Sequence, residues 1–157
     1  MNLPIFVSAT SGDLGAARDL VVRVLTSGLG YQARVQPTLP FSGGDLRAEL
    51  RRLIDECGMV IQLVGFRCGQ MPPTVEPEFG LVSYTQFEAR YAEQTGKRVL
   101  YITLPEGFPF TSCDPESDDK IALRKRSHSS ATRRWRTVLW GRSTKDGGWR
   151  RDRKSVV

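Results

Sequence analysis

The sequence predicts an α/β domain built on a parallel β-sheet. Four short apolar runs alternate, along the first 104 residues, with three longer segments in which apolar residues recur at helical spacing. Strands that alternate with helices pair in parallel, because each helix carries the chain back to the same end of the sheet in a right-handed crossover. With 157 residues, of which 39% are hydrophobic and 25% charged, the chain is sufficient for one packed domain of this kind.

The predicted strands cover residues 4–10, 31–36, 59–64 and 99–104. Apolar residues run together in the first, third and fourth of them, which is typical of strands buried on both faces. The first strand, Pro-Ile-Phe-Val-Ser-Ala-Thr, leads into a Ser-Gly-Asp turn. The second strand has the weakest pattern.

Three amphipathic helices are predicted over residues 14–29, 45–57 and 83–95. Asp13 is expected to cap the first of them, because its carboxylate can accept hydrogen bonds from the unpaired N–H groups of a helix start. A proline-containing loop over residues 65–82 precedes the third helix.

These elements favour a flavodoxin-like three-layer sandwich with strand order 2-1-3-4. The sheet has four strands, or five if the segment after residue 112 supplies another. Ligands of such folds bind outside the carboxyl ends of the strands, at the point where the strand order reverses. Here those ends are residues 8–13 and 65–69, and the third helix begins beside them.

Composition excludes several function classes. No apolar run reaches the roughly 18 residues of a membrane span, and no basic, apolar leader stands at the N-terminus, so we expect a cytoplasmic protein without membrane contact. Cys57, Cys68 and Cys113 form neither a CxxC pair nor a disulfide framework. His128, the one histidine, leaves no basis for a zinc site or a Ser-His-Asp triad. We therefore expect no metal and no cofactor.

Charge changes abruptly near residue 112. Residues 1–112 carry 10 Lys and Arg against 11 Asp and Glu, whereas residues 113–157 carry 13 against 6, together with all three tryptophans. We therefore predict an α/β domain over residues 1–112 and a basic Arg/Trp-rich tail over residues 113–157.

Three interpretations of this tail stay open. It is a disordered or frame-shifted stretch, a remnant of a further helix and strand, or a segment that binds nucleic acid through basic and aromatic side chains. The first is favoured because the apolar residues of the tail have no period, and nucleic acid is the least favoured partner.

Four motifs occur in order along the chain. They are Ile-Phe-Val-Ser-Ala-Thr-Ser-Gly-Asp-Leu, Asp-Leu-Arg-x-Glu-Leu, Val-Ile-Gln-Leu-Val-Gly-Phe-Arg-Cys-Gly and Val-Ser-Tyr-Thr-Gln-Phe-Glu-Ala-Arg-Tyr-Ala. Together they resemble the bacterial domain-of-unknown-function family 4062, a group similar to Toll/interleukin-receptor (TIR) domains. The resemblance covers about residues 3–113 and leaves out the tail. It implies a TIR-like fold and a role in signalling or defence.

The resemblance also implies a catalytic candidate. In enzymatic relatives of the wider fold, a glutamate at the start of the helix after the third strand acts on the ribosyl bond of NAD, and Glu88 stands at the corresponding place. A carboxylate can stabilise or attack the oxocarbenium-like centre that forms when such a bond breaks. The alternative is local, because Thr85-x-x-Glu88 and Ser83-x-x-Gln86 both fit the capping-box pattern. Capping alone is the favoured role of Glu88.

The turn after the first strand supplies most of the candidate ligand contacts. These are Ser8, Thr10, Ser11, Gly12 and Asp13. Small residues let a ligand approach the backbone, and the following helix start offers N–H groups to a phosphate. The charge of Asp13 opposes a phosphate and suits a ribose hydroxyl. An ordinary helix cap explains the same residues and is slightly favoured.

Two further candidates come from the other side of the predicted crevice. Arg67 follows the third strand and could hold a phosphate or carboxylate with two parallel hydrogen bonds, although pairing with Glu76 or Glu78 is equally compatible with its position. Tyr84 opens the third helix and could stack on a base, whereas Phe87 is expected in the core.

Two functions are compatible with these features. One is an enzyme that acts on the N-ribosyl bond of NAD or a related nucleotide, with Glu88 as the catalytic group and NAD as a substrate. The other is a module that self-associates to transmit a signal without chemistry. An enzyme needs the Glu88 carboxylate in an open pocket, whereas the module can leave it in a filled groove.

We expect the tail from about residue 114 to pack poorly, because its one-signed charge and aperiodic apolar residues cannot offset the entropy of ordering it. Limited proteolysis should therefore remove this segment and leave a folded core. A protease-resistant tail in which Trp135 and Trp140 are buried would contradict the expectation.

Overall fold

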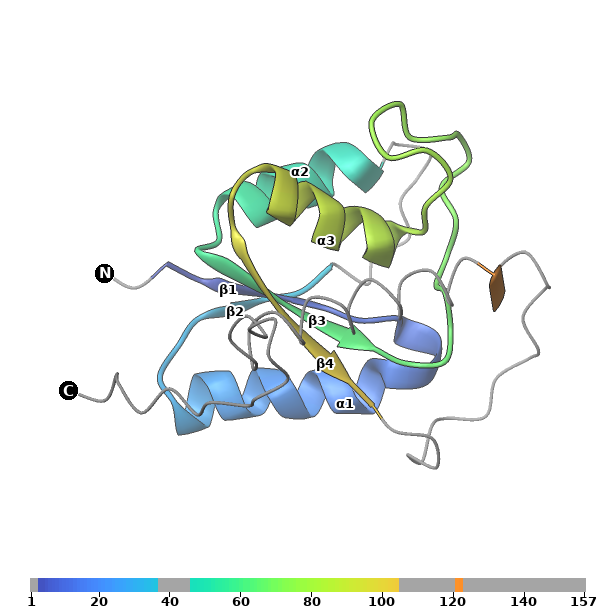
Figure 1. Cartoon of the computed structure of the whole chain (residues 1–157). Coiled ribbons are helices and arrows are strands. Elements are labelled where there is room, and N and C mark those ends of the chain that lie inside the picture. The colour runs from blue at the N-terminus through green and yellow to red at the C-terminus, as the bar shows by residue number, and fades with distance from the viewer. Residues whose placement is uncertain (1–2, 37–45, 105–120, 123–157) are drawn as a thin grey trace, which may run out of the picture.

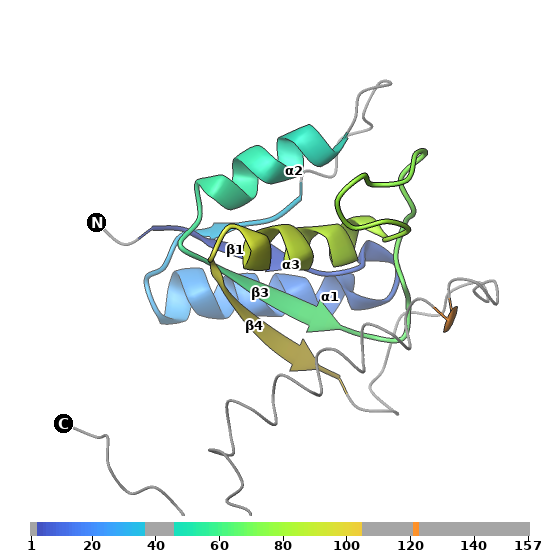
Figure 2. The ribbon, with the colours of Figure 1, turned by 45° about the horizontal axis from the view of Figure 1, so that its top comes forward.

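The computed structural model describes residues 3–36, 46–104 and 121–122. Its strands are β1 (Ile5–Ser8), β2 (Ala33–Arg34), β3 (Met59–Val64) and β4 (Arg98–Thr103). Its helices are α1 (Ser11–Arg23), which runs into a π-helical segment η1 (Val24–Gly28), then α2 (Leu46–Asp55) and α3 (Tyr84–Gln94). Helix α1 covers one face of the sheet, and α2 and α3 cover the other (Figure 1; Figure 2).

All strand pairs are parallel, and their order is β2-β1-β3-β4. The register places Val7 opposite Ile61 and Ile61 opposite Leu100. The predicted three-layer α/β architecture and its strand order are confirmed. The fifth strand that the sequence left open falls on residues outside the described ranges, as do the loop over residues 37–44 and nearly all of the tail after residue 112.

Side chains of the central strands divide the core into two clusters. Phe6 and Val60 pack against α2 and α3, together with Leu50, Ile54 and Phe87. Val7 and Ile61 point to the opposite face and pack with Leu14 and Leu25. Because neighbouring residues of a strand point to opposite faces, Ser8 and Gln62 lie on the same face as Phe6 and Val60, under α3.

Several boundaries differ from the sequence prediction. Helix α1 begins at Ser11, so Asp13 lies within its first turn and Thr10 is the residue that precedes it. The π-helical segment that extends α1 has no signature in the apolar spacing. Strand β2 has only two residues, consistent with its weak pattern. No helix among the described residues is long and apolar enough to cross a membrane.

The long loop over residues 65–82 is fixed to α2 by a buried ion cluster. Glu76, whose side chain is 2% exposed, accepts hydrogen bonds from Arg47 at 2.9 Å and from Arg51 at 2.8 Å. Arg47 also donates to the Thr74 hydroxyl at 2.6 Å. Glu76, one of the two carboxylates considered as a partner of Arg67, therefore pairs with α2 instead.

Removing the charge of Glu76 should destabilise the fold. Glu76→Gln leaves the buried Arg47 guanidinium without its counter-ion, and breaking a buried pair in this way costs roughly 3 kcal/mol. Urea denaturation should show this loss in the free energy of unfolding. Glu56→Gln is the control, because Glu56 pairs with Arg52 on the exposed face of α2 and its loss should leave stability nearly unchanged. Equal effects of the two variants would contradict a structural role for the Glu76 cluster.

Candidate functional site

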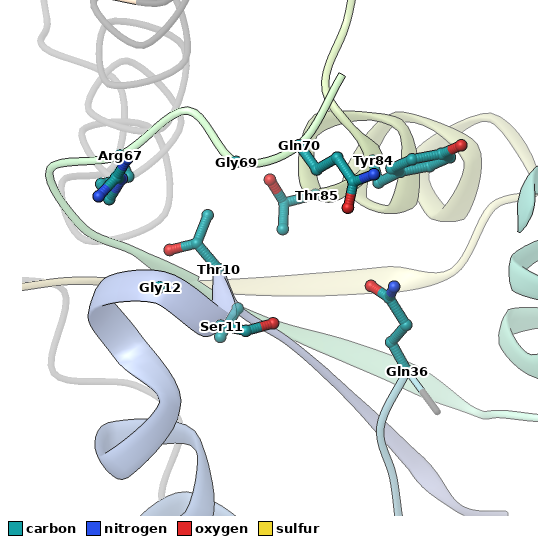
Figure 3. Close-up of a pocket in the computed structure, with 10 residues that line it drawn as sticks. Thr10, Ser11, Gly12, Gln36, Arg67, Gly69, Gln70, Tyr84 and Thr85 are labelled. Carbon is teal, nitrogen blue, oxygen red and sulfur yellow. The ribbon is translucent and has the colours of Figure 1, made fainter. Parts of the chain in front are cut away.

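A pocket of about 350 Å³ opens at the carboxyl edge of the sheet, between β1 and β3 (Figure 3). The turn from β1 into α1, the loop after β3 and the first turn of α3 form its walls. Five of the seven predicted ligand-contact residues line it: Thr10, Ser11, Gly12, Arg67 and Tyr84. The pocket thus lies where the strand order predicts a binding crevice.

The other lining residues were not named as ligand contacts. Ala9 and Gly69 lie within the predicted crevice ends, residues 8–13 and 65–69, whereas Gln36, Gln70 and Thr85 lie outside them. Gln36 follows β2 and reaches the same sheet edge, so the rule that located the crevice could also have indicated it. Thr85 was considered only as a helix cap, but it donates a hydrogen bond from Oγ1 to the Cys68 carbonyl at 3.1 Å.

The Asp13 side chain connects the two walls of the pocket. Its Oδ2 accepts hydrogen bonds from the backbone N–H groups of Phe66 and Arg67, both at 3.1 Å. The Thr10 hydroxyl donates to its Oδ1. Asp13 is 5% exposed and does not line the pocket. The prediction that it caps α1 was wrong, because its carboxylate is used by the loop after β3.

Two glycines allow this close packing of the loop. A Cβ on Gly65 would lie 2.7 Å from Asp13 Oδ2, so a side chain there would push the loop away from the carboxylate. Gly69 has a φ of +91°, and a Cβ on it would lie 3.0 Å from both Thr10 and Thr85. The loop backbone can therefore pass between the turn after β1 and the start of α3.

The first turn of α1 faces the pocket and has no side-chain cap. Thr10, the residue in the capping position, directs its hydroxyl to Asp13. Ser11 and Gly12 are exposed at the mouth of the pocket (Figure 3). The positive end of a helix dipole with small residues around it is an environment that suits an anionic group.

Glu88 does not cap α3. The capping box is the pair Ser83 and Gln86, in which the Gln86 side chain accepts from the Ser83 N–H at 3.0 Å and the Gln86 N–H donates to the Ser83 hydroxyl at 3.3 Å. Glu88 instead accepts a hydrogen bond at Oε2 from the hydroxyl of Ser8. The capping interpretation of Glu88 was therefore wrong.

Glu88 lies in the core beneath the pocket. It is 1% exposed and Ser8 is 2% exposed, and neither lines the pocket. Glu88 stands one helical turn after Tyr84 and Thr85, which do line it. Burial raises the pKa of Glu88 to about 8, an effect that the hydrogen bond from Ser8 reduces only in part. Burial thus favours the neutral carboxylic acid at this position.

A family model described as a domain of unknown function, DUF4062, matches residues 4–128. The chain belongs to this family. The match continues past residue 113, where the resemblance of the motifs ended. A solved structure, 2-desoxiribosyltransferase from Leishmania mexicana, is similar with a TM-score of 0.46 and 14% sequence identity, over 82% of this chain and 97% of that one. No curated protein matches the sequence.

The described part of this DUF4062 domain holds no cluster of three or more His, Cys, Asp or Glu side chains that could bind a metal ion. The pocket itself presents hydroxyl groups and Arg67, and the Glu88 carboxyl lies beneath them.

The stability of the DUF4062 domain should fall as pH rises from about 4.5 to 8. In this window the folded protein keeps a proton on Glu88 that the unfolded chain, with a pKa of 4.5, has released. The unfolded state then binds fewer protons, so the free energy of unfolding decreases with pH, by at most ~5 kcal/mol for this group.

Glu88→Gln should remove this pH-dependent part of the free energy of unfolding, because glutamine does not ionise. Urea denaturation at a series of pH values measures it, with the exposed Glu78→Gln as the matched control. A Glu88→Gln profile parallel to that of the wild type would show that Glu88 does not titrate in this range.

Proposed function

We propose that this DUF4062 domain is a TIR-like, cytoplasmic signalling or defence domain that binds a nucleotide in the pocket and cleaves the N-ribosyl bond of NAD or a related nucleotide. The observation that carries the proposal is the position of Glu88, one helical turn below a pocket at the switch point of a parallel sheet. A buried acid with a raised pKa next to such a pocket is a common mark of a functional site.

The pocket offers suitable groups for a nucleotide. The first turn of α1 and the Arg67 guanidinium would bind phosphate. Tyr84 would provide an aromatic surface for the base, and the hydroxyls of Thr10 and Ser11 would contact the ribose. Asp13 is a positioning residue, because its hydrogen bonds hold Thr10 and Arg67 on facing walls of the pocket.

Glu88 would act at the anomeric carbon of the ribose. For this the ribose must reach the carboxyl group from the pocket and replace Ser8 as its hydrogen-bond partner. The ionised form then stabilises the oxocarbenium-like centre that develops as the bond breaks.

One observation favours a second candidate, a self-associating TIR-like module without catalysis. The Glu88 carboxyl is enclosed with Ser8 in the described structure, as expected if it only holds α3 against β1. Nucleic-acid binding would depend on residues 113–157, nearly all of which lie outside the described ranges.

Incubation of the purified full chain with NAD, followed by chromatography for free nicotinamide, tests the activity, with adenine and uridine nucleotides assayed for free base. Glu88→Gln keeps the size of the side chain and removes its charge, and should lower turnover by about 100-fold or more. Glu78→Gln should retain wild-type turnover. Activity that survives Glu88→Gln would remove Glu88 as the catalytic group. A wild-type chain that releases no base and forms oligomers in sedimentation experiments would favour the self-associating module.

A further inference from the structure

Two buried oxygen atoms lie without a hydrogen-bond partner on the α3 side of the sheet. Among the described residues they are Glu88 Oε1 and Gln62 Oε1, and each is inaccessible to solvent. Gln62 stands opposite Ser8 in the register of β3 on β1, and Ser8 is bonded to Glu88. Ser8, Gln62 and Glu88 therefore form one polar cluster within an apolar core.

The two unpartnered atoms, Gln62 Oε1 and Glu88 Oε1, are both hydrogen-bond acceptors when Glu88 is ionised. The Gln62 amide nitrogen donates to the Leu63 carbonyl at 3.4 Å, which leaves the amide oxygen as the unpartnered end. The Ser8 hydroxyl is used by Glu88 Oε2. Two buried acceptors without a donor are costly, and a proton on Glu88 Oε1 would supply a donor, because a carboxylic acid has an O–H group. Burial favours the same neutral form.

We propose that Gln62 is a positioning residue that accepts a hydrogen bond from a proton on Glu88 Oε1, and that Glu88 gives this proton to the departing base of a nucleotide whose base is uncharged. The inference rests on the proposed function and narrows its substrate class. It adds Gln62, which does not line the pocket, to the residues on which the reaction depends.

The substrate class follows from the charge that the base carries after the N-ribosyl bond breaks. When this bond breaks, its electron pair stays on the base nitrogen. Nicotinamide in NAD carries a positive charge on that nitrogen and leaves as a neutral molecule without a proton. A purine or pyrimidine base would leave as an anion, so it needs a proton from a general acid. A neutral Glu88 is suited to the second class.

The complete step balances without an oxidant or a reductant. The Glu88 proton moves to the base nitrogen as the bond from nitrogen to the ribose breaks, and the free base leaves neutral. The carboxylate that remains stabilises the oxocarbenium-like ribose. A water oxygen then bonds to the same ribose carbon, and the proton that this water loses returns to Glu88. The products are the free base and ribose phosphate.

Incubation of the full chain with adenosine monophosphate, uridine monophosphate and NAD in parallel tests the substrate class. We expect free adenine or uracil to appear at least about tenfold faster than free nicotinamide, because general acid catalysis benefits only the uncharged bases. Release of nicotinamide alone would overturn this inference and leave the proposed function standing. Release of no base from any of the three would overturn both.

Infrared difference spectra test the hydrogen bond without reference to activity. The wild type minus Glu88→Gln spectrum at neutral pH should contain the carbonyl band of a protonated carboxyl group. Gln62→Met keeps the length of the side chain and removes the acceptor, so this band should move to higher frequency, and turnover should fall by about tenfold with little change in KM. Gln32→Met, at an exposed position, is the matched control. A spectrum with carboxylate bands only, or a band that Gln62→Met does not move, would overturn the role of Gln62.

Discussion

The hydrogen bonds of the Asp13 carboxylate determine the shape of the candidate site. One side chain near the start of α1 binds the Thr10 hydroxyl and two backbone N–H groups that lie more than 50 residues further along the chain. A buried carboxylate that accepts several hydrogen bonds holds its partners firmly in place, because charge-assisted hydrogen bonds are stronger than neutral ones. It therefore joins the β1–α1 turn to the loop after β3 at the pocket.

The long loop between β3 and α3 is held at three further places. Glu76 binds Arg47 and Arg51 of α2. The Tyr84 N–H donates to the Gln70 carbonyl at 3.0 Å, and Thr85 holds the Cys68 carbonyl. A loop of this length would ordinarily sample many conformations, but these attachments fix the segment that carries Arg67 and Gly69. The pocket is therefore formed before any ligand arrives, which reduces the entropic cost of binding.

The elements that the sequence predicted well are those whose pattern is set by burial. The Met59–Val64 strand agrees with the prediction at both ends, because its apolar run, interrupted only by Gln62, is bounded by Gly58 and Gly65. The roles of Asp13 and Glu88 could not be predicted in the same way. Both fit a local capping pattern, and each is used instead by a partner far along the chain, which capping statistics do not register. Ser83-x-x-Gln86 and Thr85-x-x-Glu88 are equivalent as patterns, and the start of α3 at Tyr84 decides between them, because it leaves Ser83 in the N-cap position.

The buried cluster itself argues for chemistry at Glu88. If the side chain served only to join α3 to β1, a glutamine would perform better, because its carbonyl could accept from Ser8 and its amide could donate to Gln62 without any tendency to ionise. An acid at a site that is 1% exposed instead makes folding less favourable as pH rises above 4.5, the pKa of the unfolded chain. Glutamate at this position therefore stabilises the fold less than glutamine would. Its one advantage over glutamine is that it can release a proton. Its place one helical turn below a preformed pocket is where that ability can be used.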